Sequence, residues 1–154
     1  MLDLADEAED VTDALLLIRR RLAHAQFIMP PTVGHELAAD ARQIGNQEDQ
    51  QRALRAFRLA RDWDIRPTDL LAVGHGIAEQ IGRRLRETGL LPEEEVNDSL
   101  IAAETALLGA TLLLPGDEHL RGMDFQRLTF ELRSFDVAVP VIATPREIVR
   151  KFFA

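Results

Sequence analysis

Three acidic residues, Glu36, Asp98 and Asp117, fall where the elements of an α/β protein would place functional groups. Glu36 lies in the first or second turn of a helix that follows a predicted strand, and Asp117 directly follows another predicted strand. In an open parallel sheet, ligands bind beyond the carboxyl ends of the strands. Asp98 joins the other two if the N-terminus of its helix points to the same edge, where the helix dipole would favour its ionised form.

Three converging carboxylates repel one another unless a divalent cation neutralises them. Oxygen ligands with open water positions favour Mg²⁺ or Mn²⁺. Such a metal can activate water and stabilise charge on an attacked phosphate, so phosphodiester hydrolysis is the predicted chemistry. On spacing alone, however, a solvated-surface role explains the three acids better, because the chain has 26 acidic residues. Glu104, on the same helix as Asp98, is expected to be a surface residue or a support for a ligand.

Other kinds of site have little support in the sequence. The chain has no cysteine, which excludes disulfides and thiolate zinc sites. Its four histidines lack the spacing of zinc ligands, and packing or surface positions explain them. Along one predicted helix, arginines step by three at Arg52, Arg55, Arg58 and Arg61. They either guide RNA or form a solvated face, and the solvated face is favoured.

Composition predicts that residues 1–154 form one globular domain. Hydrophobic residues make up 46% and charged residues 29%, which is ordinary for a globular protein and argues against a disordered chain. The acidic N-terminus predicts no export signal, and no apolar run approaches the roughly 20 residues of a membrane span. We therefore expect a cytoplasmic protein without membrane association. The net charge of −8 opposes approach to polyanions unless metal ions or a local basic face invert the potential.

Apolar periodicity predicts helices that alternate with short strands. Helices are expected over residues 11–22, 49–63, 69–87, 97–108 and 146–153, with a further one beginning at residue 32. Strands are expected over residues 26–29, 110–114 and 137–142. The predicted N-caps are Thr32, Thr68, Asn97 and Thr144, and Gly109 is the predicted C′ residue. In the helix over 49–63, the side chains expected to point inward are Leu54, Phe57 and Leu59. This alternation predicts an α/β fold with helices on both faces of a parallel sheet.

Three stretches of the sequence resemble the motifs of PIN domains. Residues 97–120, which include NDSLIAA, LLGATLL and GDEHL in that order, resemble the third and fourth motifs of the family. Residues 30–37, PPTVGHEL, resemble the second motif, and residues 141–147, VIATPRE, resemble the closing strand and helix. The resemblance covers the scaffold of most of the chain, whereas residues 46–92 match only as generic helices.

The resemblance implies a three-layer α/β/α PIN-like fold with a short parallel sheet, and a metal-dependent endoribonuclease that hydrolyses RNA. It implies that Glu36, Asp98 and Asp117 are catalytic metal ligands and that Mg²⁺ or Mn²⁺ is the cofactor. The family includes the toxin halves of toxin–antitoxin pairs. An antitoxin protein and a second copy of the chain in a homodimer are therefore the implied partners, besides the RNA substrate.

Two departures from the PIN pattern leave a second function open. The family's first, central strand ends in an aspartate, but only residues 1–4 remain of it here, so the first strand is expected to be truncated. We expect the first catalytic aspartate to lie upstream of Met1, because Asp3 is a poor substitute. The family also has threonine or serine two residues before the fourth-motif aspartate, where this chain has Pro115. The alternative is a catalytically impaired PIN-like module that binds RNA or a protein partner.

Overall fold

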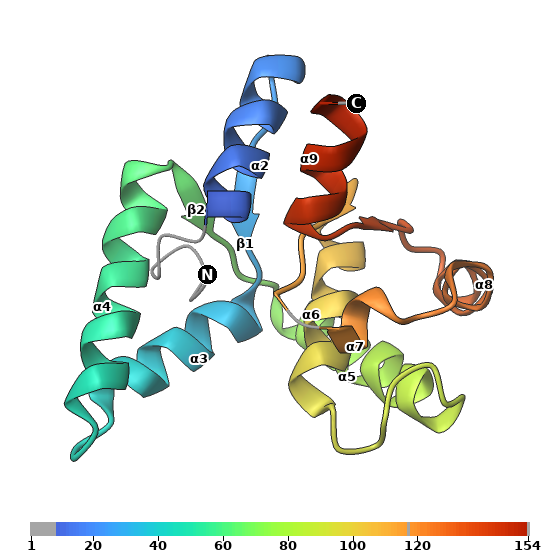
Figure 1. The fold of residues 1–154 in the computed structure, drawn as a ribbon. Helices are drawn as coiled ribbons and strands as arrows, with labels where there is room; N and C mark the ends of the chain where they lie inside the picture. The colour runs from blue at the N-terminus through green and yellow to red at the C-terminus, as the bar shows by residue number, and fades with distance from the viewer. Residues whose placement is uncertain (1–8, 117, 154) are drawn as a thin grey trace. The chain divides into compact units, whose positions relative to one another are not determined.

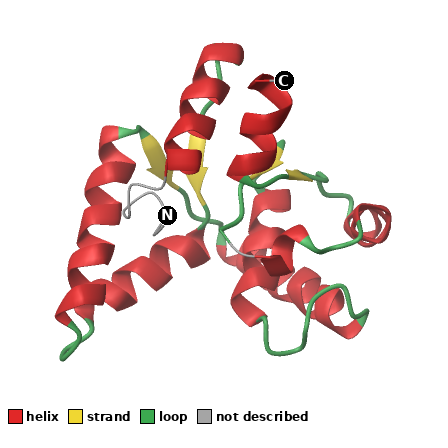
Figure 2. Cartoon of the chain, in the orientation of Figure 1, coloured by secondary structure: helices red, strands yellow, loops and turns green. Residues whose placement is uncertain are grey.

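The structure is a computed structural model that describes residues 9–116 and 118–153 of the chain. By its internal contacts the chain divides into two compact units. Unit 1 comprises Met1–Thr68 and Thr144–Ala154, and unit 2 comprises Asp69–Ala143. Among the described residues, eight helices and two parallel pairs of short strands make an α/β protein that is mostly helical (Figure 2). The predicted α/β class is therefore confirmed.

The described part of unit 1 contains one pair of parallel strands and four helices. Its elements are α2 (Glu9–Arg21), β1 (Phe27–Met29), α3 (Pro31–Arg42), α4 (Gln47–Asp62), β2 (Ile65–Pro67) and α9 (Pro145–Phe153). Phe27 is paired with Ile65 in the β1–β2 ladder. Thr68 extends this ladder, since its backbone N–H and its hydroxyl both donate to the carbonyl oxygen of Met29, at 3.0 and 2.7 Å.

Helix α4 packs against α3 through small residues. On α4 the buried side chains are those of Ala53, Ala56 and Ala60, which let α3 approach closely. The prediction that Leu54 and Phe57 point inward is wrong, because 42% and 37% of their surfaces are exposed. The alanine stripe, not the larger side chains, faces the interior.

Helices α2 and α9 lie side by side in unit 1 (Figure 1). Near their starts, Arg146 Nε lies 2.7 Å from Asp10 Oδ2. The start of α9 is a capping box: Thr144 N–H donates to Glu147 Oε2 at 2.8 Å, and Glu147 N–H donates to the Thr144 hydroxyl at 3.3 Å. The predicted cap at Thr144 and first-turn proline at Pro145 are confirmed.

Unit 2 is built on two adjacent helices with shorter elements around them. Its elements are α5 (Ala72–Glu87), α6 (Val96–Leu107), β3 (Leu112–Leu113), α7 (Glu118–Arg121), α8 (Phe125–Ser134) and β4 (Val141–Ile142). The strands pair in parallel, with Leu112 opposite Val141. The two helices with the most extensive mutual contact are α5 and α6.

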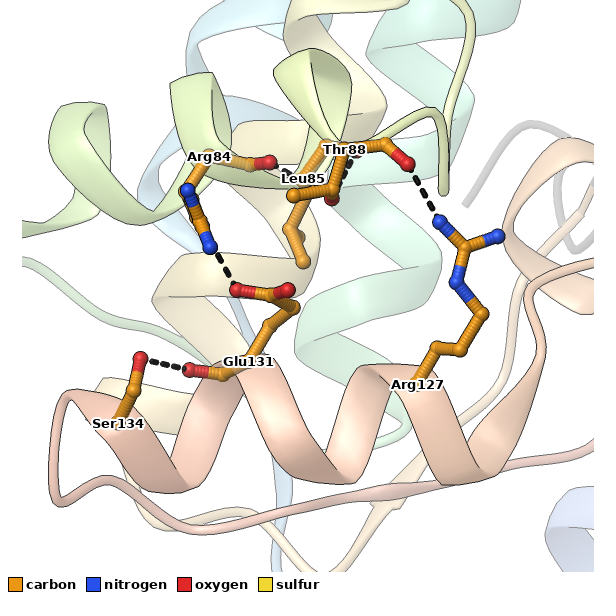
Figure 3. A network of polar contacts seen from close by, with 6 residues as sticks. All are labelled: Arg84, Leu85, Thr88, Arg127, Glu131 and Ser134. Carbon is orange, nitrogen blue, oxygen red and sulfur yellow. Dashed lines mark hydrogen bonds and ion pairs between the residues drawn. The ribbon is translucent and has the colours of Figure 1, made fainter.

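Polar contacts attach α8 to α5, as Figure 3 shows. Arg84 Nε donates to Glu131 Oε2 at 2.8 Å, and Arg127 donates to the carbonyl oxygen of Thr88. The hydrogen bond that Arg84 donates to Glu131, together with the negative charge of Glu131, raises the pKa of Arg84 above its ordinary value. The carboxylate of Glu131 is largely buried and the guanidinium of Arg84 is about half-exposed.

Several predicted boundaries and caps differ from those observed. Thr32 lies inside α3, whose N-cap is Pro30, because Pro31 already supplies a first-turn position without an N–H. The N-cap of α5 is Leu71, since the hydroxyl of Thr68 is used by the β1–β2 pair. Asn97 lies in the first turn of α6, after an N-cap at Glu95. Gly109 has a φ of 69°, as a residue at C′ requires, so that prediction is confirmed.

The strands are shorter than predicted and form two pairs. The strand expected over residues 110–114 is reduced to β3, and the one expected over 137–142 is reduced to β4. Strand β2 and helices α7 and α8 were not predicted; the segment of α7 was expected to be an acidic turn. No helix in the described part of the chain is long and apolar enough to cross a membrane.

Candidate metal centre

Asp98 occupies a buried position in the first turn of α6, with only 9% of the residue exposed. A carboxylate in the first turn is stabilised by the partial positive charge of the helix N-terminus. The neighbouring side chain holds this turn in place: the Ser99 hydroxyl donates to the carbonyl oxygen of Val96 at 2.7 Å and accepts from Arg86. The local structure therefore presents Asp98 from a rigid element.

Two further side chains of unit 2 lie next to Asp98. His119 Nδ1, on α7, lies 3.7 Å from Asp98 Oδ2 and 3.3 Å from Glu95 Oε1. One ligand atom from each of these three residues lies within 4.8 Å of the other two. Asp98 is the most buried of the three, Glu95 is partly buried, and the side chain of His119 is half-exposed. The group therefore has a buried floor and a side that is open to solvent.

The donor atoms of this group fit a divalent cation. Two carboxylates suit hard ions such as Mg²⁺ and Mn²⁺, whereas an imidazole suits transition metals. A mixed set of two carboxylates and one imidazole fits Mn²⁺ better than Mg²⁺. To bind a metal through Nδ1, His119 must be neutral. A protonated His119 could instead form ion pairs with Glu95 and Asp98 without any metal, and the two arrangements can be separated by experiment.

The three carboxylates singled out by sequence have different places in the structure. Asp98 belongs to the group just described. Glu36 lies on α3 in unit 1, at an exposed position one residue before the buried Leu37. Asp117 lies outside the described residues. The convergence of Glu36, Asp98 and Asp117 on one metal ion therefore stays a prediction.

Sequence reasoning did not single out Glu95 or His119 as ligands, although two signals were present. Glu95 precedes Asp98 by three residues, a spacing that places two side chains on the same side of a helix. His119 follows Asp117 by two residues, within the stretch that resembles the fourth PIN motif. Glu104 is only 3% exposed, so the expectation that it could be a surface residue is wrong. It lies among the buried residues of α6.

Comparisons with protein-family models, with curated proteins and with solved structures found no match. A functional assignment must therefore rest on the residues of the chain and on the geometry of each unit.

Proposed function

We propose that the chain is a metal-dependent endoribonuclease of the PIN type, with a three-layer α/β/α fold, that hydrolyses RNA phosphodiester bonds. One observation supports this most directly. Asp98, an acid that the motif resemblance singles out, is buried in a first helical turn beside Glu95 and His119, within reach of one cation. The motif resemblance of Asp98 depends on residue order, whereas its grouping with Glu95 and His119 depends on side-chain positions.

In this proposal each side chain has a distinct task. A bound Mn²⁺ or Mg²⁺ would supply an activated water molecule and offset negative charge on the phosphate. Asp98, buried and held by its helix, provides a carboxylate in a fixed position. Glu95, which is partly exposed, supplies the second carboxylate of the site. His119, half-exposed at the rim, would complete the ligand set with a ring nitrogen.

The resemblance extends the proposal to residues and partners outside this group. We include Glu36 and Asp117 as further metal ligands because they occupy the acidic positions of the second and fourth motifs. In this proposal the protein is a cytoplasmic, toxin-like ribonuclease. It forms a homodimer and is inhibited by an antitoxin protein. These additions rest on the motifs alone.

A second candidate function is a PIN-like module that binds RNA or a protein partner without cutting. The observation that favours it is Pro115, which is buried and stands where the family has a hydroxyl side chain. Proline can neither order a water molecule through a hydroxyl nor donate from its backbone nitrogen. Binding of RNA or of a protein partner without RNA cleavage would indicate this function.

Calorimetric titration with Mn²⁺ tests the metal site. Asp98→Asn should weaken Mn²⁺ binding by about tenfold or more, because it removes a ligand charge at a buried position. The matched control is Asp136→Asn: Asp136 is exposed and has a φ of 57°, a conformation that asparagine tolerates. Glu36→Gln tests the predicted ligand from the second motif. Equal Mn²⁺ affinity in the native chain and in Asp98→Asn would contradict the proposed site.

A further inference from the structure

A concentration of positive charge lies on unit 1. The last turn of α2 carries Arg19, Arg20 and Arg21, and the last turn of α9 carries Arg150 and Lys151. These five residues are called the basic end below. All five are exposed. The basic end stands out because the chain as a whole has a net charge of −8.

The cations come together because α2 and α9 are neighbours that run in the same direction (Figure 1). The Arg146–Asp10 ion pair joins the second residues of the two helices, so their last turns point toward the same end. At a rise of about 1.5 Å per residue, the cations of α2 begin roughly 7 Å beyond those of α9. The positive charge is therefore spread along a line and not concentrated at one point.

No acidic residue interrupts the segments that carry these cations. The sequence has no aspartate or glutamate between Asp13 and Glu36, and none from Ile148 to Ala154. Among ion pairs formed between described residues, none involves Arg20, Arg21, Arg150 or Lys151. The positive potential of the basic end is therefore available to a ligand.

Arg19 adds an aromatic component to this surface. Its guanidinium lies 5.4 Å from the ring centroid of Phe27 and 5.0 Å from that of Trp63. It also donates to the backbone carbonyl oxygen of Trp63. These contacts hold the guanidinium in one place, which lowers the entropic cost of binding a phosphate group there.

Helix dipoles account for only part of this charge. A helix C-terminus carries about half of a negative elementary charge. The two neighbouring C-termini of α2 and α9 therefore carry about one negative charge, which about one cation neutralises. Five cations at the basic end exceed that need severalfold. Asp62 and Asp64, which flank Trp63, are paired with Arg61 and Arg66. A cluster of arginine side chains suits the regularly spaced phosphates of a nucleic acid strand.

We propose that the basic end binds the phosphate backbone of single-stranded RNA. The choice of RNA rests on the proposed function, but the binding surface does not require cleavage. It would serve a ribonuclease by capturing substrate, and it would serve an impaired module as its RNA-binding surface. An anionic membrane surface is the competing ligand, and the test below includes it.

The test measures binding of a fluorescent single-stranded RNA in EDTA, so that cleavage does not interfere. The patch variant combines Arg20→Gln, Arg21→Gln, Arg150→Gln and Lys151→Gln, and leaves Arg19 on its aromatic rings. The control variant removes the same charge from exposed arginines elsewhere, through Arg42→Gln, Arg58→Gln, Arg83→Gln and Arg133→Gln. Because the net charge of the two variants is the same, their difference reports the local contribution of the basic end.

We expect the patch variant to lose about tenfold or more in RNA affinity and the control variant no more than about threefold. The slope of log affinity against log salt should fall by roughly 2 to 3 in the patch variant, at about 0.7 per lost phosphate contact. Equal losses in the two variants, or no RNA binding by the native chain, would overturn the proposal. Binding to phosphatidylserine vesicles in preference to RNA would overturn it as well.

Two further measurements keep the result interpretable. Circular dichroism checks that the patch variant is folded, and Arg20→Gln with Arg150→Gln provides a milder variant that should show about half of the salt-slope change. If the native chain binds RNA in EDTA but fails to cut it when Mn²⁺ is supplied, the proposed function fails and the basic end stands.

Discussion

Gly82 on α5 lies directly against Ser99 on α6. A Cβ at position 82 would fall 3.0 Å from Ser99 Oγ and 3.3 Å from the Ser99 backbone carbonyl carbon. Ser99 is fully buried, and its hydroxyl is already held by Val96 and Arg86. The close approach of the two helices therefore depends on glycine at this position, and it positions the turn that carries Asp98.

Gly82→Ala should lower the free energy of unfolding by about 1 to 3 kcal/mol, because the added methyl group overpacks the α5–α6 contact. The control is Gly76→Ala on the same helix, where a Cβ would meet nothing within 4 Å. That change should stabilise the protein by about 0.5 to 1 kcal/mol through helix propensity. Urea unfolding followed by circular dichroism measures both. Equal effects in the two variants would contradict the close packing.

Thr144→Ala should lower the free energy of unfolding by about 1 kcal/mol, because it removes the hydroxyl of the capping box at the start of α9. Thr129→Ala is a suitable control, since the Thr129 hydroxyl only donates to a backbone carbonyl within its own helix. Thermal unfolding compares the two variants. If Thr129→Ala lowers the stability as much as Thr144→Ala does, the capping box has no special role in stability.

Arg84→Gln should destabilise the chain by removing the ion pair with Glu131, but by less than Leu132→Ala. Leu132 is fully buried, so its truncation should cost about 2 to 5 kcal/mol. Arg84 and Glu131 should also be coupled: the double variant Arg84→Gln, Glu131→Gln should be less destabilised than the sum of the single variants.

The pH dependence of this pair follows from the raised pKa of Arg84. A raised pKa means that the stabilisation is complete below the ordinary arginine pKa and is lost only as the pH rises through the folded-state value. Between about pH 7 and about pH 10, the stability difference between the native chain and Arg84→Gln should therefore be constant. A difference that shrinks across this range would mean that Arg84 is not the group responsible.

His119→Ala separates a metal ligand from a simple ion-pair partner. If Nδ1 is a ligand, Mn²⁺ affinity in calorimetry should fall by about tenfold or more. If His119 is only a counterion for Glu95 and Asp98, its removal should leave Mn²⁺ binding unchanged or make it tighter. His75→Ala, which removes a histidine that pairs with Asp69 elsewhere in unit 2, is the control.

The sequence predicted most helices and the position of every strand except β2. Apolar periodicity and the cap at Thr144 were sufficient for α2, α6 and α9. The inward face of α4 was not predictable from hydrophobicity, because alanine is the residue that fits against α3 there. Strand β2 was missed because Pro67, which normally ends a strand, lies at the edge of a three-residue pair.

Part of the candidate site was also predictable. Asp98 was identified from its place in a motif and in a first helical turn. His119 was missed because its partners, Glu95 and Asp98, lie more than 20 residues away in the sequence and only the fold brings them together. The basic end was likewise hidden, since its two halves are separated by most of the chain and meet only through the pairing of α2 with α9.

Cleavage of a labelled single-stranded RNA in the presence of Mn²⁺ tests the central claim most directly. The native chain should cut the RNA only when the metal is present, and EDTA should abolish the activity. Asp98→Asn should lose at least about a hundredfold in rate, whereas Asp136→Asn should cut at the native rate. Cleavage by Asp98→Asn at the native rate, or no metal-dependent cleavage by the native chain, would contradict the account.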